Sequence, residues 1–253
     1  MIAVTAAPCA SAMRCDKMTV AGFEAALEAM RATIIASPAV VAAAEEHAAA
    51  GDGVRADDIA TESLLSSRFV SHLAKCAVRP SPTAGVGVFA EADIAPGELV
   101  TFYPGDAITY LPPGISSEQA KRTGTRGVIW GLHVPEHMRQ LMTAMEDYAL
   151  NTMDDTYGVV GLRALDDDMA YVGHLINDGA CLGYFGSVAE YVRVSRQRAN
   201  VGHSTLLGCH TATIATRAIA PGEELFVTYG PRYWRSKQRR RIVQASQVLS
   251  SCL

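Results

Sequence analysis

Apolar residues near the start of the chain recur at intervals of three or four positions. After Thr19, this spacing joins Phe23, Leu27, Met30 and Ile34. One face of an α-helix presents residues at such intervals, and threonine is a favourable residue just before a helix. The pattern therefore predicts a helix that begins after Thr19.

Two more helices are predicted before residue 77. Ser37 followed by Pro38 is a typical helix start, and Gly51 is a typical stop. A third helix is expected to open at Asp57 or Asp58, and three apolar residues form its stripe: Leu65, Phe69 and Leu73. Alanine fills twenty of the first sixty positions. Residues 1–76 are thus predicted to be an alanine-rich helical region, either a small bundle or an arm packed on another part.

From residue 77 onward the pattern changes to short apolar runs broken by glycine and proline, which predict strands. The candidate strands are residues 87–90, 99–103, 157–162, 211–215 and 225–229. Two Ala-Pro-Gly-Glu segments, at 95–98 and 220–223, have the chemistry of a type II turn. One helix is expected over residues 135–151, with Pro135 at its start. Its apolar face would be Met138, Leu141, Met142, Met145 and Tyr148.

The composition indicates a folded globular chain. Of the 253 residues, 49% are hydrophobic and 19% charged, which excludes a disordered tail or a collagen-like repeat. No apolar run approaches the roughly 18 residues of a membrane-spanning helix, and the start lacks the basic region of a signal peptide. The six cysteines form no CxxC pair, so we expect reduced thiols and no metal site. These features favour an intracellular protein of the nucleus or cytoplasm, with no membrane partner; the alanine-rich start leaves an organelle open.

Positive charge is concentrated near the C-terminus. Residues 232–241 carry six lysine or arginine side chains, and the rest of the chain has 16 positive against 26 negative groups. An acidic body suits a cationic substrate, and the basic tail is a candidate contact for chromatin or another acidic surface. A solvated C-terminal helix is the alternative interpretation of the same residues.

Two short motifs match functional signatures in the wrong context. Residues 85–90, GVGVFA, fit the dinucleotide fingerprint, but a turn with Pro96 follows where the fingerprint requires a helix. Residues 133–137, HVPEH, fit a zinc-protease pattern, but Pro135 would interrupt the helical turn that holds both histidines on one face. The two histidines are instead expected to lie on the surface at the start of a helix.

Four separated segments carry the strongest functional signal. In chain order they are GVGVFA at 85–90, YPGD at 103–106, GHLINDG at 173–179 and ATRAIAPGEELFVTYG at 215–230. Together they resemble the SET-domain family of protein-lysine methyltransferases, in a form without zinc-binding cysteine clusters on either side. The resemblance implies a mixed, mainly β fold of small curved sheets with a threaded C-terminal segment, called a pseudoknot, beside the helical N-terminal region.

The resemblance also implies a division of the chain. The SET domain would span residues 77–235, with a helical insert at about 111–151. Residues 236–253 would form a basic C-terminal helix or tail.

The cofactor implied by the family is S-adenosylmethionine. The residues expected to bind it are Gly85, Val86, Gly87, Asn177, Asp178 and Trp234. At Gly85 and Gly87 the backbone could approach the methionine part of the cofactor, where a Cβ would collide. Asp178 stands where the family usually has histidine, which leaves its side-chain role open. Trp234 is expected either to stack over the adenine or simply to pack.

Tyr229 and Tyr103 are the residues implied to be catalytic. If residues 225–229 are extended, Val227 and Tyr229 share one face of the strand. In the family this face lines a narrow channel that admits the lysine, and Tyr229 would orient the amine there. Tyr103 resembles the second channel position, and Val227 with Phe226 would complete the substrate channel.

The expected activity is transfer of a methyl group to a lysine side chain of a protein, for which a histone is one candidate. The cofactor's sulfonium already makes the methyl group reactive, so the protein must chiefly align a neutral amine behind it. A catalytically silent SET-like binding module is the alternative; the change at Asp178 favours it and the intact Tyr229-Gly230 pair opposes it. A helical adaptor, supported only by the alanine-rich region, is a second alternative.

Overall fold

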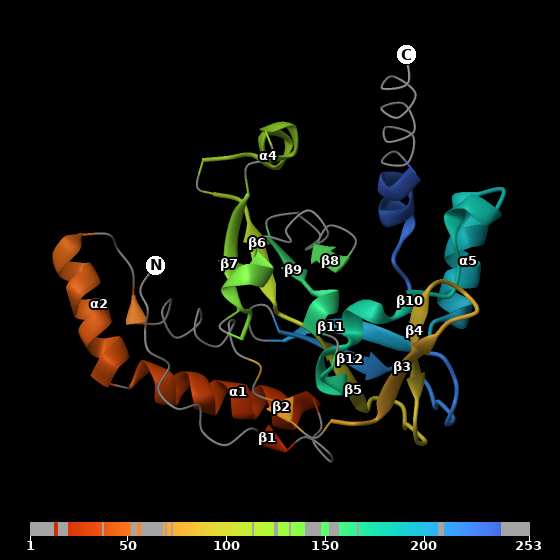
Figure 1. Ribbon diagram of the computed structural model, residues 1–253, viewed down its shortest axis with the longest axis horizontal. Helices are drawn as coiled ribbons and strands as arrows, with labels where there is room; N and C mark the ends of the chain where they lie inside the picture. Colours follow the sequence, from red (N-terminus) through yellow and green to blue (C-terminus); the bar gives the residue numbers. More distant parts are fainter. Residues whose placement is uncertain are drawn as a thin grey trace.

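The first two predicted helices are confirmed in the computed structural model (Figure 1). The structure describes residues 13–14, 20–36, 38–51, 55–56, 68, 70–71, 73–112, 114–123, 126–131, 133–139, 148–151, 157–165, 167–206 and 210–238. The first helix, α1 (Val20–Ile35), and the second, α2 (Pro38–Ala50), begin at the expected places. Gly51 ends α2 with φ of 75°, a left-handed conformation that glycine adopts without strain. Thr19 and Ser37, the two expected caps, lie outside the described residues.

The strands form small sheets of two to four members in the part of the chain that the structure describes. The antiparallel sheets are β3 (Cys76–Pro80) with β4 (Val86–Ala90); β11 (Val201–Leu206), β12 (His210–Ala215) and β5 (Leu99–Tyr103); and β7 (Gly127–Trp130), β6 (Ala107–Tyr110), β9 (Tyr157–Val160) and β8 (Ala149–Asn151). The parallel pairs are β1 (Met13–Arg14) with β2 (Val70–Ser71), and β10 (Asn177–Asp178) with β13 (Phe226–Val227). The mixed, mainly β fold class is confirmed.

Short helices connect these sheets. They are α4 (Ser117–Thr123), α5 (Val188–Arg198) and the 3-10 helices η2 (Arg163–Leu165), η3 (Met169–Tyr171), η4 (Gly173–Leu175) and η5 (Leu182–Tyr184). Residues 231–238 form a further helix after β13. In Figure 1, α1 and α2 lie on one side of the sheets, while α5 and the C-terminal helix stand together on the other.

Both predicted Pro-Gly turns are confirmed, and they face each other. Gly97 and Gly222 have φ of 81° and 82°, as the third residue of a type II turn requires. The residues just before the turns, Ile94 and Ile219, exchange two backbone hydrogen bonds of 3.0 Å. This pairing joins the entry to β5 with the segment that leads into β13.

The main hydrophobic core surrounds β10 and β13. Its buried members are Cys76, Val88, Ala90, Ile94, Val100, Val172, Leu175, Ile176, Val201, Ala215, Ile219, Leu225 and Val227. Leu225 is fully buried, and burying one such side chain contributes about 1.5–3 kcal/mol to folding. The segment that carries the last predicted motif is therefore fixed by the core itself.

The helix predicted over residues 135–151 is wrong at its end. Residues 136–139 form a short 3-10 turn, and residues 140–147 lie outside the described residues. Residues 149–151 are not helical but form β8, which pairs with β9. Most of the third predicted helix, before residue 70, also lies outside the described residues. Near the expected C-terminal end of that helix, the chain forms the strand β2 instead. In both places sheet pairing with distant residues outweighs the local apolar spacing.

Apolar spacing in the sequence did not reveal the helix α5. Its signal was a capping box: the Ser187 Oγ accepts a hydrogen bond of 3.1 Å from the Glu190 amide at the first turn. Tyr191 and Ser195 lie one turn apart on the same face and are both fully buried. The helix therefore packs through a face that is partly polar, which a search for apolar residues overlooks.

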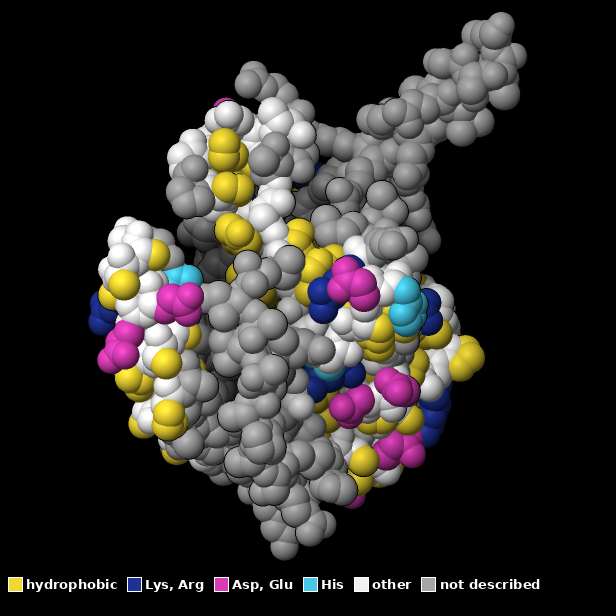
Figure 2. All heavy atoms as spheres, turned by 60° about the vertical axis from the view of Figure 1, so that its left-hand side comes forward, with side chains coloured by type: hydrophobic (Ala, Val, Ile, Leu, Met, Phe, Trp, Pro, Cys, Tyr) yellow, Lys and Arg dark blue, Asp and Glu magenta, His cyan; other side chains and the backbone are white. Residues whose placement is uncertain are grey.

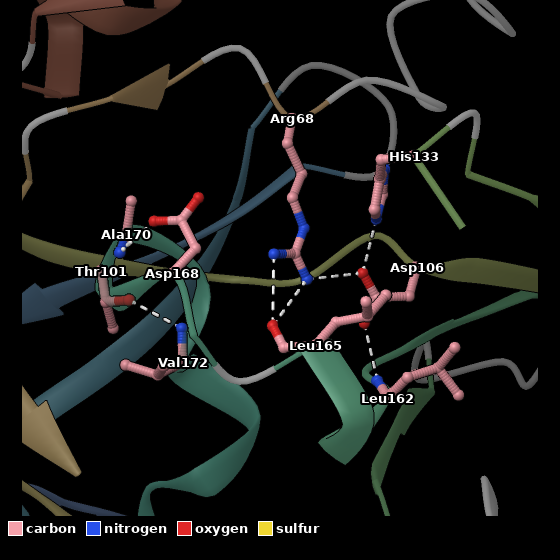
Figure 3. A network of polar contacts seen from close by, with 9 residues as sticks. All are labelled: Arg68, Thr101, Asp106, His133, Leu162, Leu165, Asp168, Ala170 and Val172. Atoms are coloured by element: carbon pink, nitrogen blue, oxygen red, sulfur yellow. Dashed lines mark hydrogen bonds and ion pairs between the residues drawn. The ribbon is translucent and has the colours of Figure 1, made fainter. Parts of the chain in front are cut away.

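His133, which was predicted to lie on the surface, has a side chain that is only 21% exposed, because it forms part of a polar network with Asp106 (Figure 3). The Asp106 carboxylate is fully buried and accepts hydrogen bonds from the Arg68 guanidinium at 2.8 Å and the Leu162 amide at 2.6 Å. His133 Nε2 lies 2.7 Å from the same carboxylate. His137, in contrast, is exposed as expected.

The charges of the described side chains are mixed on the face that carries α1 and α2. Figure 2 shows acidic, basic and apolar side chains interspersed there. None of the described helices is both long enough and apolar enough to cross a membrane. No group of three histidine, cysteine or acidic side chains is arranged to hold a metal ion in the described part of the chain.

Candidate active site

Tyr229 follows β13 and is fixed beside the end of η4. Burial alternates through this segment, with Leu225 and Val227 buried and Thr228 exposed, as in an extended strand. Phe226, on the other face, is half-buried. The Tyr229 hydroxyl donates a hydrogen bond of 2.7 Å to the carbonyl oxygen of Ile176. The phenol therefore has a defined position, and its oxygen keeps lone pairs that can accept a hydrogen bond.

Aromatic side chains gather around this phenol. The Tyr233 ring contacts that of Tyr229 edge to face at 4.6 Å between centroids, and the Trp234 ring stacks on it at 6.1 Å. Tyr103, at the end of β5, is 8% exposed and donates a hydrogen bond of 2.6 Å to the carbonyl oxygen of Tyr148. We call Tyr103, Tyr148, Tyr229 and Tyr233 the tyrosine cluster.

Two members of the tyrosine cluster were not among the expected site residues. Tyr148 was expected only on the apolar face of a helix, and no role was predicted for Tyr233. Burial raises the pKa of the Tyr103 hydroxyl, and Tyr229, Tyr233, Asp106 and Tyr148 raise it further. The Tyr103 hydroxyl is therefore within electrostatic range of the other three tyrosines. The sequence offers one local signal for Tyr233, which is its place beside Trp234 shortly after the last motif.

The hydroxyl groups of Tyr229 and Tyr103 are held in the protonated form by their raised pKa values. Burial raises the pKa of Tyr229, and the neighbouring Tyr233 and Asp178 raise it further. Burial, followed by the effect of Tyr229, likewise raises the pKa of Tyr103. A phenol with a raised pKa remains neutral, so it donates and accepts hydrogen bonds. The phenolate, which is the form that could take up a proton, is not populated. These tyrosines are therefore suited to orienting a ligand rather than to acting as general bases.

Asn177 joins the glycine-rich segment to the segment before β13. Its Nδ2 donates to the carbonyl oxygens of Ala84 and Val86 at 3.2 and 2.9 Å. The same nitrogen lies 3.1 Å from Oε1 of the buried Glu224, which also accepts a hydrogen bond of 2.7 Å from the Ser81 hydroxyl. One amide thus connects three of the four sequence motifs.

The two glycines of this segment differ in their surroundings. Gly85 is exposed and has φ of 52°, and no atom lies within 4 Å of the place that a Cβ would take. At Gly87 a Cβ would overlap Oε1 of Glu224 and lie 3.0 Å from its Cδ. Gly87 is therefore required by the close approach of a carboxylate from this chain, whereas open space at Gly85 is compatible with an approaching ligand.

Replacing Gly87 by alanine is expected to destabilise the protein by about 1–3 kcal/mol, because the added methyl group must displace the hydrogen-bonded Glu224 carboxylate. The free energy of unfolding, measured in urea, tests this. Gly97→Ala is the control: its φ of 81° adds backbone strain, but no atom lies near the new Cβ. Cofactor affinity should fall in the Gly87 variant and stay unchanged in the control. Equal affinities in both variants would contradict the coupling of Gly87 to Asn177 through Glu224.

Asp178 is buried and its carboxylate is committed to protein donors. Oδ1 accepts a hydrogen bond of 3.0 Å from the Ala180 amide, and Oδ2 accepts one of 3.1 Å from the Tyr229 amide. Oδ2 also accepts one of 3.0 Å from Nε1 of the Trp234 indole. A contact between Asp178 and a cofactor would therefore come from its backbone.

Asn200 plays a structural part near the site. It is fully buried, its Nδ2 donates to the carbonyl oxygen of Glu224 at 2.8 Å, and its Oδ1 accepts from the Phe226 amide at 2.7 Å. Glu223 beside it is paired with Arg217 and caps the second Pro-Gly turn through the Ala220 amide. These contacts hold the segment before Tyr229 and leave Asn200 no free amide group for a ligand.

Comparison with protein families agrees with this architecture. The SET domain family matches residues 85–230, which is more than half of the chain. The protein therefore belongs to the SET-domain family, a family typical of protein methyltransferases. No curated protein matches the chain.

The residues present fit the cofactor of that family. Its sulfonium cation suits a site of neutral phenols and backbone carbonyls with a buried carboxylate nearby, because each of these favours positive charge. Its amino and carboxylate groups need directed polar partners, and the open backbone at Gly85 lies next to the Asn177 amide contacts.

Proposed function

We propose that this protein transfers a methyl group from S-adenosylmethionine to a lysine side chain of a protein substrate. The observation that carries the proposal is the fixed Tyr229 phenol within the tyrosine cluster, held by the Ile176 carbonyl. Bound S-adenosylmethionine supplies a methyl group that is already activated. The protein then has to bind, orient and desolvate the amine.

The described residues can meet each of these needs. The Tyr229 hydroxyl oxygen can accept a hydrogen bond from the amine and so direct its lone pair. Burial of a lysine amine beside the tyrosine cluster would exclude water and lower the pKa of that amine, which favours the neutral nucleophile. The nearby carboxylates of Asp178 and Glu224 are hydrogen-bonded to protein donors, so no carboxylate is assigned as a base.

The basic C-terminal segment is proposed to contact an acidic partner surface, of which chromatin is one candidate. Within residues 232–238, the described part of that segment, Arg232 and Arg235 are exposed. Arg193 and Arg196 of α5 are exposed as well, and α5 contacts the C-terminal helix through Tyr191 and Trp234. We therefore propose that the positive surface of residues 232–241 extends onto α5, where it can attract negative charge.

Calorimetric titration with S-adenosylmethionine tests the proposal first. We expect micromolar affinity, about −8 kcal/mol, followed by transfer of labelled methyl groups to proteins of a lysate. No heat and no thermal shift at millimolar cofactor would refute it. Cofactor binding without transfer to any protein would instead identify a catalytically silent SET-like module.

Val227 is proposed to leave the channel wide enough for more than one methyl group. It is 3% exposed and packs in the main core, against which Tyr148 and Tyr229 also pack. Many SET domains carry phenylalanine or tyrosine at this position, and valine is smaller and offers no hydroxyl. Mass spectrometry of a substrate peptide, run to completion, should show products beyond monomethyl-lysine. A single methyl group, unchanged in a folded Val227→Tyr variant, would contradict this role.

A further inference from the structure

The carboxylate of Asp178 is held from α5 as well as from the active site. Ser195 Oγ donates to Oδ1 at 2.6 Å, and the Tyr191 hydroxyl donates to Oδ2 at 2.5 Å. Tyr191 and Ser195 are fully buried and lie four residues apart, so both come from one face of the helix. With the donors described above, the carboxylate accepts five hydrogen bonds, and a buried carboxylate needs such donors to remain charged.

Tyr191 extends this arrangement to the segment after Tyr229. Its hydroxyl oxygen accepts hydrogen bonds from the Gly230 amide at 3.0 Å and from Nε1 of Trp234 at 3.1 Å. Asp178 itself binds the Tyr229 amide and the same indole. Residues of α5 and the C-terminal segment, which lie 13 to 56 positions from Asp178 in the sequence, therefore share one carboxylate.

We propose that Asp178 is a positioning residue, whose buried negative charge fixes Tyr229 and Trp234 and favours the cationic cofactor over its neutral product. This inference rests on the proposed function. Asp178 occupies a position where the family usually has histidine. The donors from α5 explain how this chain accommodates a carboxylate there: Tyr191 and Ser195 supply the hydrogen bonds that it needs.

The field of this charge reaches the place where the chemistry would occur. After burial and Tyr233, Asp178 is a cause of the raised pKa of the Tyr229 hydroxyl. A negative charge that disfavours an anion at Tyr229 favours a cation in the same place. S-adenosylmethionine carries a sulfonium charge, and its product S-adenosylhomocysteine lacks it. The ratio of the two affinities therefore isolates the effect of charge from a general loss of structure.

Asp178→Asn removes the charge and changes the shape of the side chain little. The amide oxygen can still face Tyr229 and Trp234. The amide nitrogen would replace Oδ1, where the Ser195 hydroxyl can rotate to accept but the Ala180 amide loses its acceptor. We expect the preference for S-adenosylmethionine over S-adenosylhomocysteine to fall about tenfold, which is the effect of one charge over roughly 12 Å at an effective dielectric constant of about 20. An unchanged preference would overturn the electrostatic part of the proposal.

Asp168→Asn is the matched control. Its Oδ1 accepts a hydrogen bond of 3.0 Å from the amide two residues ahead, at Ala170, as Asp178 does from Ala180. It has no contact with Tyr229 or Trp234 among the described residues. The control should keep the wild-type preference, and an equal fall in both variants would overturn the assignment to Asp178.

Tyr191→Phe tests the positioning role while the charge stays in place. We expect turnover to fall about tenfold with an unchanged KM for the substrate peptide, because Gly230 and Trp234 lose their shared acceptor. Unchanged turnover would overturn the positioning role, and this test does not depend on the folding of the Asp178 variant.

Fluorescence separates this inference from the proposed function. In a Trp130→Phe background, Trp234 is the remaining tryptophan, and both Asp178→Asn and Tyr191→Phe should move its emission maximum. If the wild-type protein binds no cofactor, the proposed function fails, whereas a shifted emission still supports the assigned contacts. An emission maximum that neither variant changes would overturn them.

Discussion

Tyr229→Phe is expected to abolish most methyl transfer while cofactor binding and folding are retained. The variant keeps the ring contacts with Tyr233 and Trp234 and loses only the hydroxyl that is held by the Ile176 carbonyl. That hydroxyl is assigned to orient the amine, so its loss acts mainly on the transition state. We expect kcat to fall at least about a hundredfold, which corresponds to about 2.7 kcal/mol.

Steady-state kinetics with labelled cofactor, together with calorimetry, would measure this separation. Tyr110→Phe is the control, because Tyr110 is an exposed residue of β6 outside the tyrosine cluster. Wild-type turnover in the Tyr229 variant would exclude the catalytic role. A large loss of cofactor affinity with normal turnover at saturation would instead assign the hydroxyl to binding.

Asp106→Ala is expected to cause the largest loss of stability, about 3–5 kcal/mol, because it leaves the largely buried Arg68 cation without its carboxylate. The carboxylate is fully buried, and the Arg68 side chain is 13% exposed. His133 and the Leu162 amide lose the same acceptor. Figure 3 shows the Arg68 guanidinium between Asp106 and the carbonyl oxygen of Leu165. The free energy of unfolding in urea tests the prediction.

An exposed ion pair provides the matched control. Glu136 pairs with Arg139 at 2.7 Å, but the Glu136 side chain is 84% exposed, so Glu136→Ala should change the free energy of unfolding by less than about 0.5 kcal/mol. A loss below about 1 kcal/mol in the Asp106 variant would show that the buried network contributes no more than a surface pair.

The Asp106 carboxylate should make the free energy of unfolding depend on pH in the acidic range. Burial works to raise the pKa of Asp106, but hydrogen bonds from His133, Arg68 and the Leu162 amide, with the charge of Arg68, outweigh it and lower the pKa. Because the folded-state pKa lies below the unfolded value of about 3.9, the contribution is fully present above that value. It is lost as pH falls through the folded pKa. The wild-type protein should therefore lose stability more steeply below pH of about 4 than Asp106→Ala does.

The elements that the sequence predicted correctly depend on local chemistry. Pro38 and Gly51 mark the bounds of α2 because proline fits the first turn of a helix and glycine adopts the conformation that ends it. Gly97 and Gly222 define their turns because glycine adopts the positive φ that the third residue of a type II turn requires. Where apolar spacing alone carried a prediction, as over residues 135–151, strand pairing of β8 with β9 replaced part of the helix.

The family could be recognised from the sequence because four short motifs occur in a fixed order, and the match over residues 85–230 confirms it. The roles of single residues were less accessible. Gly87 was expected to let a cofactor approach its backbone. The place that a Cβ would take at Gly87 is instead occupied by an oxygen of Glu224. His133 was expected on the surface, but it contacts a carboxylate 27 positions away.

The sequence by itself determined the turns, the first two helices, the family and the candidate tyrosine at position 229, because each depends on residues that are neighbours in the chain. Only the tertiary structure decided which distant groups meet. It placed Tyr148 and Tyr233 beside Tyr103 and Tyr229, and it gave Asp178 its donors from α5. Such contacts depend on strand register and helix packing, and a buried charge is stable only where that packing supplies its partners.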